Sequence, residues 1–242
     1  MAEGAANETG WITRKGEQLT LEEAVAQWDP ALVGRRLELA EQQRQEVLSR
    51  FPLDGWAMMP LERYALGTAQ SADSFCHWME FQTLAIASIR GGSALKLLIY
   101  KRANEPGWYF DPRYEDEHKA WQAVRAGFVR AFELAAAGRF MEIGSIDAIA
   151  SGPSLVTKTV YVYFPEGIIP ICSHAHQQHY WEQLGGTDEL PGGVPGAYRL
   201  LRFARERLGW ADQSPAEIAR FLYWWADPRA APAIVKIASG KV

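Results

Sequence analysis

Basic and small polar residues surround a glycine pair in the middle of the chain and could hold an anionic ligand. Arg90 and Lys96 flank Gly91, Gly92 and Ser93 in the run IRGGSALKLLIY. Two adjacent glycines let the backbone take positive φ or approach a ligand closely, which a Cβ would prevent. Basic side chains and backbone N–H groups at such a turn are typical of phosphate sites. The run predicts a donor-rich loop, although a tight turn ahead of a strand also explains it.

The glycine pair matches neither of the common nucleotide-binding loops. A P-loop requires Gly, four residues and then Gly-Lys-Ser/Thr, and a dinucleotide loop requires G-x-G-x-x-G; the sequence around the pair has neither pattern. We therefore expect no ATP or NAD cofactor at this turn.

Aromatic residues are the second chemical signal, because the chain contains 10 Trp, 9 Tyr and 10 Phe. Basic residues on rigid elements can bind phosphates, and an aromatic pocket can stack on a base rotated out of a duplex. The candidate DNA contacts are Arg90, Gly91, Gly92, Ser93, Lys96, Lys101, Arg102 and Lys158. The candidates for lining a base pocket are Trp56, Tyr64, Trp78, Tyr100, Trp108 and Tyr161.

Catalytic and metal-binding patterns are weak. Asp111, Glu117 and Lys119 resemble the D…E-x-K core of a metal-dependent nuclease, in which two carboxylates hold Mg²⁺ beside a lysine. The last two fall in a predicted helix, where side chains two residues apart diverge. The sequence also lacks a G-x-S-x-G elbow. We expect a binding protein rather than an enzyme, with a nuclease as the alternative.

Three histidines and two cysteines do not form a convincing metal site. His174, His176 and His179 lie in HAHQQH at the start of a predicted helix, without a carboxylate or thiol at ligand spacing nearby. Cys76 and Cys172 belong to no C-x-x-C pair, so we interpret them as buried thiols. The prediction is that the protein binds no metal.

Hydrophobic periodicity predicts an α+β fold, with a small antiparallel sheet packed with several helices. Strands are expected at 95–102 and 107–111, which form a hairpin, and at 155–164, LVTKTVYVYF, which is rich in β-branched and aromatic residues. Helices are expected at 21–28, 30–51, 75–83, 115–140, 174–185, 197–209 and 215–227.

Composition suggests three segments in one cytoplasmic chain. The formal net charge is −4, no run approaches 18 apolar residues, and the N-terminus lacks the pattern of a secretory signal. We therefore expect no membrane association. The predicted segments are an N-terminal helical segment (1–52), an α+β recognition domain (53–185) and a C-terminal helical segment (186–242) leading toward a missing domain.

Three blocks together are similar to a known family. PLERYALG with SFCHWMEF, IRGGSALKLLIY, and YVYFPEGIIPICSHAHQQHYWEQLG span about residues 60–185. They resemble the N-terminal region of McrB-like proteins, the AAA+ GTPase components of modification-dependent restriction systems, and related bacterial defence ATPases. The resemblance implies recognition of DNA, often with a modified base. The motor and the nuclease would then lie on other domains or subunits.

The leading hypothesis is a DNA-binding specificity module of a McrB-like restriction or anti-phage defence system, with modified DNA as its partner. The nuclease hypothesis rests on Asp111, Glu117 and Lys119. A third hypothesis is a protein-interaction adaptor, in which Trp224, Trp225 and the arginine-rich helix at 199–207 contact partner subunits.

Overall fold

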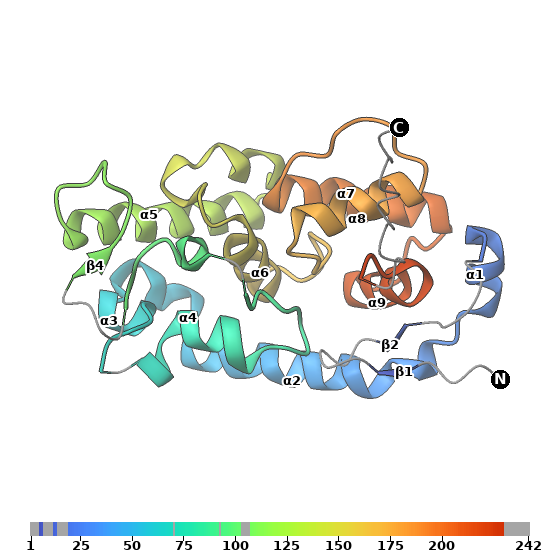
Figure 1. Cartoon of the computed structure of the whole chain (residues 1–242), viewed down its shortest axis with the longest axis horizontal. Helices are drawn as coiled ribbons and strands as arrows, with labels where there is room; N and C mark the ends of the chain where they lie inside the picture. The colour runs from blue at the N-terminus through green and yellow to red at the C-terminus, as the bar shows by residue number, and fades with distance from the viewer. Residues whose placement is uncertain are drawn as a thin grey trace, which may run out of the picture.

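The computed structural model describes residues 19–69, 71–91, 93–102 and 107–229, together with the backbone of two short strands at 5–6 and 12–13. Helices dominate this part of the chain, and its strands form two-stranded antiparallel pairs (Figure 1). The α+β expectation is thus confirmed in its coarse form, with far more helix than sheet. No helix in the described ranges has the length and apolar character needed to cross a bilayer.

In chain order, the α-helices of the described residues are α1 (Leu21–Gln27), α2 (Gly34–Arg50), α3 (Leu61–Tyr64), α4 (Phe75–His77), α5 (Glu117–Ala136), α6 (Pro153–Tyr163), α7 (His174–Gln183), α8 (Gly193–Leu208) and α9 (Pro215–Ala226). Helices α2, α5 and α8 pack around α6, which lies near the centre of the molecule (Figure 1). The caps follow the expected rules. Thr20 forms a capping box with Glu23 at the start of α1, and the side chain of Ser173 accepts from His176 N to begin α7.

Helix α6 replaces the strand expected at 155–164, so that prediction is wrong. Pro153 stands in the first turn, where its missing N–H costs nothing. All side chains from Leu155 to Val162 are buried, because α2, α5 and α8 surround the helix. Because even Thr157, Lys158 and Thr159 are buried, this helix has no solvent-facing stripe, and its sequence shows no helical period that would distinguish it from a buried strand. Packing then overrides the strand preference of the β-branched residues.

The predicted hairpin is present, but its first strand is shorter than expected. A 3₁₀ helix occupies Ala94–Leu97, and β3 covers only Tyr100–Lys101. It pairs antiparallel with β4 (Trp108–Tyr109), which places Lys101 opposite Trp108 and Tyr100 opposite Tyr109. The turn that joins the strands lies outside the described residues. The remaining short pair joins β1 (Ala5–Ala6) to β2 (Ile12–Thr13).

One hydrophobic core draws on all three segments inferred from the sequence. It runs from Ala24 in α1 through Val47 and Phe128 to Ala226 at the end of α9. On α5, the row of buried residues that includes Trp121 faces this core, and the indole N–H donates to Met59 O at 2.9 Å. The core therefore fixes the elements that carry the candidate site against one another.

A π-helical turn at Trp78–Gln82 continues α4 and is a local departure from α-helix. The hydroxyl of Thr83 donates to the carbonyls of Trp78 and Met79, which stabilises the wider turn. Residues 83–90, with a hydrogen-bonded turn at 84–86, then lead to the glycine pair. These elements place Glu80 and Gly91 near Tyr100 and Lys101 of the hairpin.

Candidate functional site

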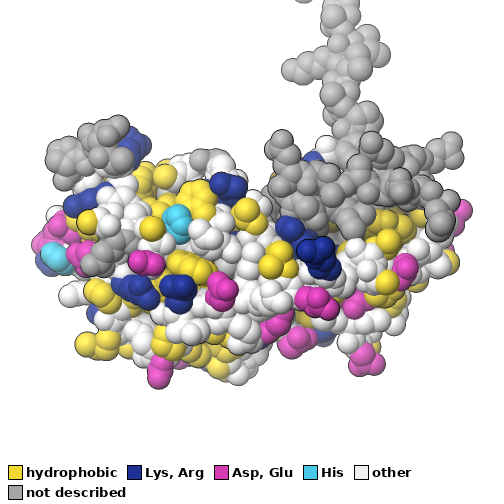
Figure 2. Space-filling view, turned by 90° about the horizontal axis from the view of Figure 1, so that it is seen from below, with side chains coloured by type: hydrophobic (Ala, Val, Ile, Leu, Met, Phe, Trp, Pro, Cys, Tyr) yellow, Lys and Arg dark blue, Asp and Glu magenta, His cyan; other side chains and the backbone are white. Residues whose placement is uncertain are grey.

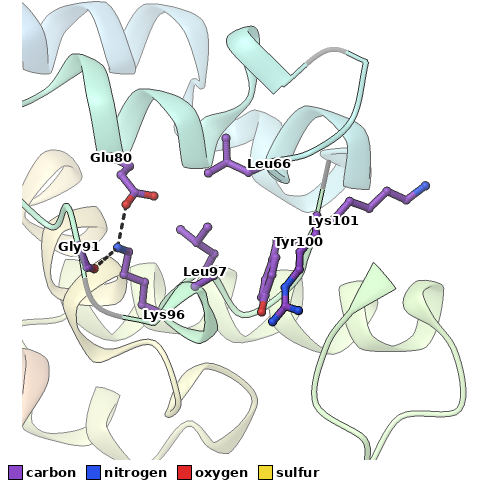
Figure 3. A pocket seen from close by; sticks show the side chains of 9 residues that line it. Leu66, Glu80, Gly91, Lys96, Leu97, Tyr100 and Lys101 are labelled. Atoms are coloured by element: carbon purple, nitrogen blue, oxygen red, sulfur yellow. Dashed lines mark hydrogen bonds and ion pairs between the residues drawn. The ribbon is translucent and has the colours of Figure 1, made fainter. Parts of the chain in front are cut away.

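An open pocket of about 250 Å³ lies between the π-helical turn, the glycine turn and the hairpin. It is lined by Leu66, Glu80, Gly91, Ala94, Lys96, Leu97, Tyr100, Lys101 and Arg102. Figure 3 shows Glu80, Gly91 and Lys96 together at one end and Tyr100 at the other, with Lys101 extending away from the cavity. The pocket is smaller than the roughly 300–1,000 Å³ typical of drug-sized ligands, so it suits one small ring.

Lys96 closes one wall of this pocket. Its Nζ donates to Glu80 Oε1 at 2.8 Å and to Gly91 O at 2.7 Å (Figure 3). The side chains of Lys96 and Glu80 are only 14% and 11% exposed, so the ion pair is partly shielded from solvent. Gly91 has a φ of +82°, which explains why glycine is needed at this position. The lysine therefore holds the glycine turn against the π-helical turn.

Three cations lie over aromatic rings on the segments that adjoin the pocket. Arg90 Cζ lies 5.2 Å from the Phe81 ring centroid, and Lys101 Nζ lies 4.7 Å from that of Trp108. Arg102 Cζ lies 4.2 Å from the ring centroid of Tyr109. Lys101 and Trp108 lie on the opposite side of the strand pair from Tyr100 and Tyr109, because successive strand residues point to opposite faces. We call the three cations and their three rings, on both sides of the pair, the hairpin face.

The hairpin face has a layered construction. Tyr109 stacks on Tyr100 with ring centroids 5.2 Å apart and an interplanar angle of 12°, and the guanidinium of Arg102 lies over the ring of Tyr109. Figure 2 shows basic and hydrophobic side chains interspersed over the left half of the face seen there, with acidic side chains among them and more of these to the right. Cation–aromatic pairs of this kind can hold a phosphate and also stack on a base.

The structure brings most of the predicted DNA contacts together. Arg90, Gly91, Ser93 and Arg102 are exposed, and Lys101 is half-buried. The hydroxyl of Ser93 accepts from Leu95 N at 3.1 Å and begins the 3₁₀ helix. Gly92 lies outside the described residues.

Lys158 is an exception, and its predicted contact with DNA is corrected. It lies on α6, the helix that was expected to be a strand, and its side chain is fully buried. Nζ donates to Met79 O and to Ala87 O, each at 2.6 Å. Because this amine points into the core behind the π-helical turn, it cannot touch a ligand on the surface.

Two of the predicted base-pocket residues, Trp78 and Trp108, are half-buried near the surface. Tyr100 lines the pocket but is only 5% exposed. Trp78 carries Arg50 over its ring at 4.2 Å.

Three of the aromatic predictions are corrected, because Trp56, Tyr64 and Tyr161 are core residues. The indole of Trp56 donates to Tyr163 Oη at 2.7 Å, and the hydroxyl of Tyr64 donates to Leu97 O at 2.9 Å. Large rings with satisfied polar atoms in a core stabilise the fold. A base could not reach these rings.

The nuclease pattern does not assemble. Asp111 accepts from Arg113, Lys119 pairs with Glu115, and Glu117 is the first residue of α5. Within the described ranges, no three His, Cys, Asp or Glu side chains group closely enough to hold a metal ion.

The three histidines of α7 make structural contacts. His174 Nε2 bonds with Leu190 O, His176 Nδ1 with Tyr223 Oη and His179 Nε2 with Ala226 O. The contact with Tyr223 and the contact with Ala226 fasten α7 to α9.

The tryptophans of the adaptor hypothesis are also enclosed. Trp224 and Trp225 are each 8% exposed, and the indole of Trp225 donates to Leu19 O at 2.9 Å. A partner subunit could not use these rings as its main contacts, so that part of the hypothesis is corrected.

Sequence reasoning missed Glu80, Phe81, Leu66 and Tyr109, which complete the pocket and its rim. A single acidic residue within the apolar run WMEF was the available signal for Glu80, since a carboxylate in such a run needs a partner. Nothing in the spacing identified Lys96 as that partner. No family model, curated protein or solved structure matches this chain.

Proposed function

We propose that this chain is a DNA-binding specificity module that uses the hairpin face to bind phosphates and the adjoining pocket to test a base. The observation that carries the proposal is the set of cation–aromatic pairs, Arg90 with Phe81, Lys101 with Trp108 and Arg102 with Tyr109, on the segments next to an open pocket. Phosphate contacts supply affinity and position, while contacts with base edges supply specificity.

The pocket offers a chemical basis for selecting a base. The Glu80 carboxylate accepts hydrogen bonds and could receive one from the exocyclic amino group of cytosine or adenine. Tyr100 is 5% exposed and already stacked on Tyr109, so it would form the wall of the pocket, and Leu66 provides an apolar contact for a methyl group. In this proposal the base leaves the duplex before it enters the pocket, because a base inside the stack presents only its edge.

The wider setting follows the family resemblance. A module that only recognises DNA would work with an AAA+ motor and a nuclease on other domains or subunits. Such a protein would direct restriction of phage DNA that carries a modified base.

Equilibrium binding tests the proposal. Labelled duplexes that are plain or modified at cytosine, together with a single strand and an RNA, are titrated by fluorescence anisotropy at about 50 and about 200 mM salt. We expect affinity for DNA to fall steeply as salt rises, and we expect a modified duplex to bind more tightly than the plain one. Absence of salt-sensitive binding to every DNA would refute the proposal, and binding to RNA alone would reassign the ligand.

A matched pair of variants tests the pocket. Ala94 lines it, whereas its neighbour Leu95 is 64% exposed outside it. Ala94→Phe should fill the pocket and abolish the difference between modified and plain duplex, with the salt-dependent affinity retained. Leu95→Phe introduces the same ring at the neighbouring position outside the pocket. It should leave the discrimination between duplexes and the salt-dependent affinity unchanged. Equal discrimination by the two variants would exclude the pocket as the base-testing site.

A further inference from the structure

Cationic side chains from three helices hold the segment that leads to the glycine turn. Arg36 on α2 donates Nη2 to Leu84 O at 3.3 Å, and Arg220 on α9 donates to Ala85 O. Lys158 on α6 donates to Met79 O and Ala87 O, each at 2.6 Å. The backbone between the π-helical turn and Arg90 is thus fixed by two arginines and one lysine that lie behind it.

Lys158 is the most enclosed of these groups, and its acceptors bracket the segment. Met79 lies in the π-helical turn beside Glu80, and Ala87 lies three residues before Arg90. A neutral amine has two N–H donors, and two carbonyls receive them, whereas an ammonium carries a third N–H. The site therefore fits the neutral amine better than the cation.

The buried surroundings of Lys158 also favour its neutral amine. Burial lowers the pKa of Lys158 from 10.5 to about 7, against the opposing influence of Cys172 and Glu80. Glu80 comes from the π-helical turn and is already bonded to Lys96, which comes from the 3₁₀ helix packed on α6.

The other charged groups around α6 lie on neighbouring helices. Arg44 on α2 donates to Val162 O, and Arg220 on α9 reaches the same segment through Ala85. Tyr161, on α6 itself, has its pKa raised to about 12 by burial and stays neutral near pH 7. Among the described residues, the hydrogen bonds of Lys158 Nζ go to backbone carbonyls and none goes to a carboxylate.

We propose that Lys158 is the positioning residue of the hairpin face: as a neutral amine it holds residues 83–91 closed through its two carbonyl acceptors, and uptake of one proton accompanies opening of this segment. Opening exposes the amine to water, where it recovers the ordinary affinity of a lysine for a proton. By linkage, opening becomes easier as the pH falls from about 10 to about 7 and levels off below that.

Hydrogen exchange of the free protein tests this inference without any nucleic acid. After correction for intrinsic rates, opening of the amides at 83–91 should increase by at most about tenfold for each pH unit lost between about 9 and about 7. Lys158→Met keeps a similar length but has no proton to gain, so this slope should vanish. Thr157→Val is the matched control, because Thr157 is equally buried on α6 and its hydroxyl has no hydrogen-bond partner among the described residues. An unchanged slope in Lys158→Met would overturn the proposal.

A second measurement covers the case in which Lys158→Met fails to fold. The ¹³Cε resonance of Lys158 in the unmodified protein should titrate with a midpoint near 7, whereas a midpoint above about 9 would overturn the proposal as well.

The consequence for ligand binding rests on the proposed function and is measured separately. DNA affinity should decline between about pH 9 and about pH 7 in the unmodified protein more than in Lys158→Met, at constant salt. If the exchange slope is present but DNA does not bind at any pH, the proposed function fails while the role of Lys158 stands. If DNA binds but the exchange slope is absent, the proposed role of Lys158 fails while the proposed function stands.

Discussion

The hairpin face and the arginine row of α8 carry the same kind of charge in different surroundings. The α8 row consists of Arg199, Arg202, Arg205 and Arg207. On that row, Arg199 pairs with Asp188 at 2.9 Å and Arg205 approaches Glu166 at 3.8 Å. Arg199 and Arg202 also lie over aromatic rings, those of Trp181 and Tyr198, so the two surfaces differ in their carboxylates. On the hairpin face, Arg90 and Lys101 contact the rings of Phe81 and Trp108.

This difference shows why a count of basic residues is a poor guide to a binding surface. A carboxylate largely neutralises its partner, whereas an aromatic ring stabilises a cation without removing its net charge. A phosphate approaching Arg90 or Lys101 meets a cation over an aromatic ring, and one approaching Arg199 must displace Asp188. The comparison favours the hairpin face as the nucleic-acid surface.

The largest effect is expected from a glycine that seats the hairpin. Gly67 has a φ of +86°, and an added Cβ would lie 2.0 Å from Lys101 O. Gly67→Ala should destabilise the protein by about 3–5 kcal/mol, from backbone strain and from the clash with a carbonyl. Gly209, which ends α8 with a φ of +68°, has open space around it. Gly209→Ala should lower the free energy of unfolding by about 1 kcal/mol, measured for both variants by urea unfolding. Equal losses in Gly67→Ala and Gly209→Ala would contradict the close contact between Gly67 and the hairpin.

Removing the two sets of charges tests the comparison directly. The triple replacement of Arg90, Lys101 and Arg102 by Ala should weaken DNA binding roughly 100-fold at low salt, and it should flatten the salt dependence. The same replacement at Arg199, Arg202 and Arg205 should change affinity by less than about threefold, because Asp188 and Glu166 already pair with two of these three arginines. Anisotropy titrations on both variants decide the matter. A larger loss from the α8 row would move the binding surface to that helix.

A smaller effect is expected from the carboxylate in the pocket. Glu80→Gln leaves Lys96 partly buried without its ionic partner, and should lower the free energy of unfolding by about 1–3 kcal/mol. The corresponding change on the α8 row, Asp188→Asn, breaks an exposed ion pair and should have little measurable effect. Chemical denaturation measures the free energy of unfolding of both variants. If Glu80→Gln is as mild as Asp188→Asn, the ion pair with Lys96 does not hold the glycine turn.

The smallest effect concerns pH and the helices behind the α8 row. Burial, with a contribution from Arg229, lowers the pKa of His176 below its usual 6.5. The folded protein therefore favours neutral His176, and this contribution is full above pH 6.5 and lost as the pH falls through the lowered pKa. The unmodified protein should lose slightly more stability than His176→Gln between pH 7 and pH 5, measured by thermal unfolding. Parallel curves for the two proteins would rule out this titration.

The sequence predicts the amphipathic elements well and the enclosed ones poorly. Helix α5 shows its buried stripe through Trp121 and Phe128, and Ser74 begins α4 as the capping rule expects. Helix α6 has no polar face, so its pattern carries no helical period and Lys158 was misplaced with it. For the site, the glycine turn and the hairpin were predictable locally. The ion pair between Glu80 and Lys96 depends on tertiary packing that no spacing rule encodes.

The hydrogen bond from the Trp225 indole to Leu19 O joins residues that are 206 positions apart in the chain. Where two distant parts of a chain meet in this way, a short linker can reconnect them and a new break can be made elsewhere. A circular permutant joined near Leu19 and Trp225 and opened at the exposed Asp188–Glu189 turn should retain the hairpin face. The same proximity would let the fold be inserted as a single unit into a surface loop of an unrelated host protein.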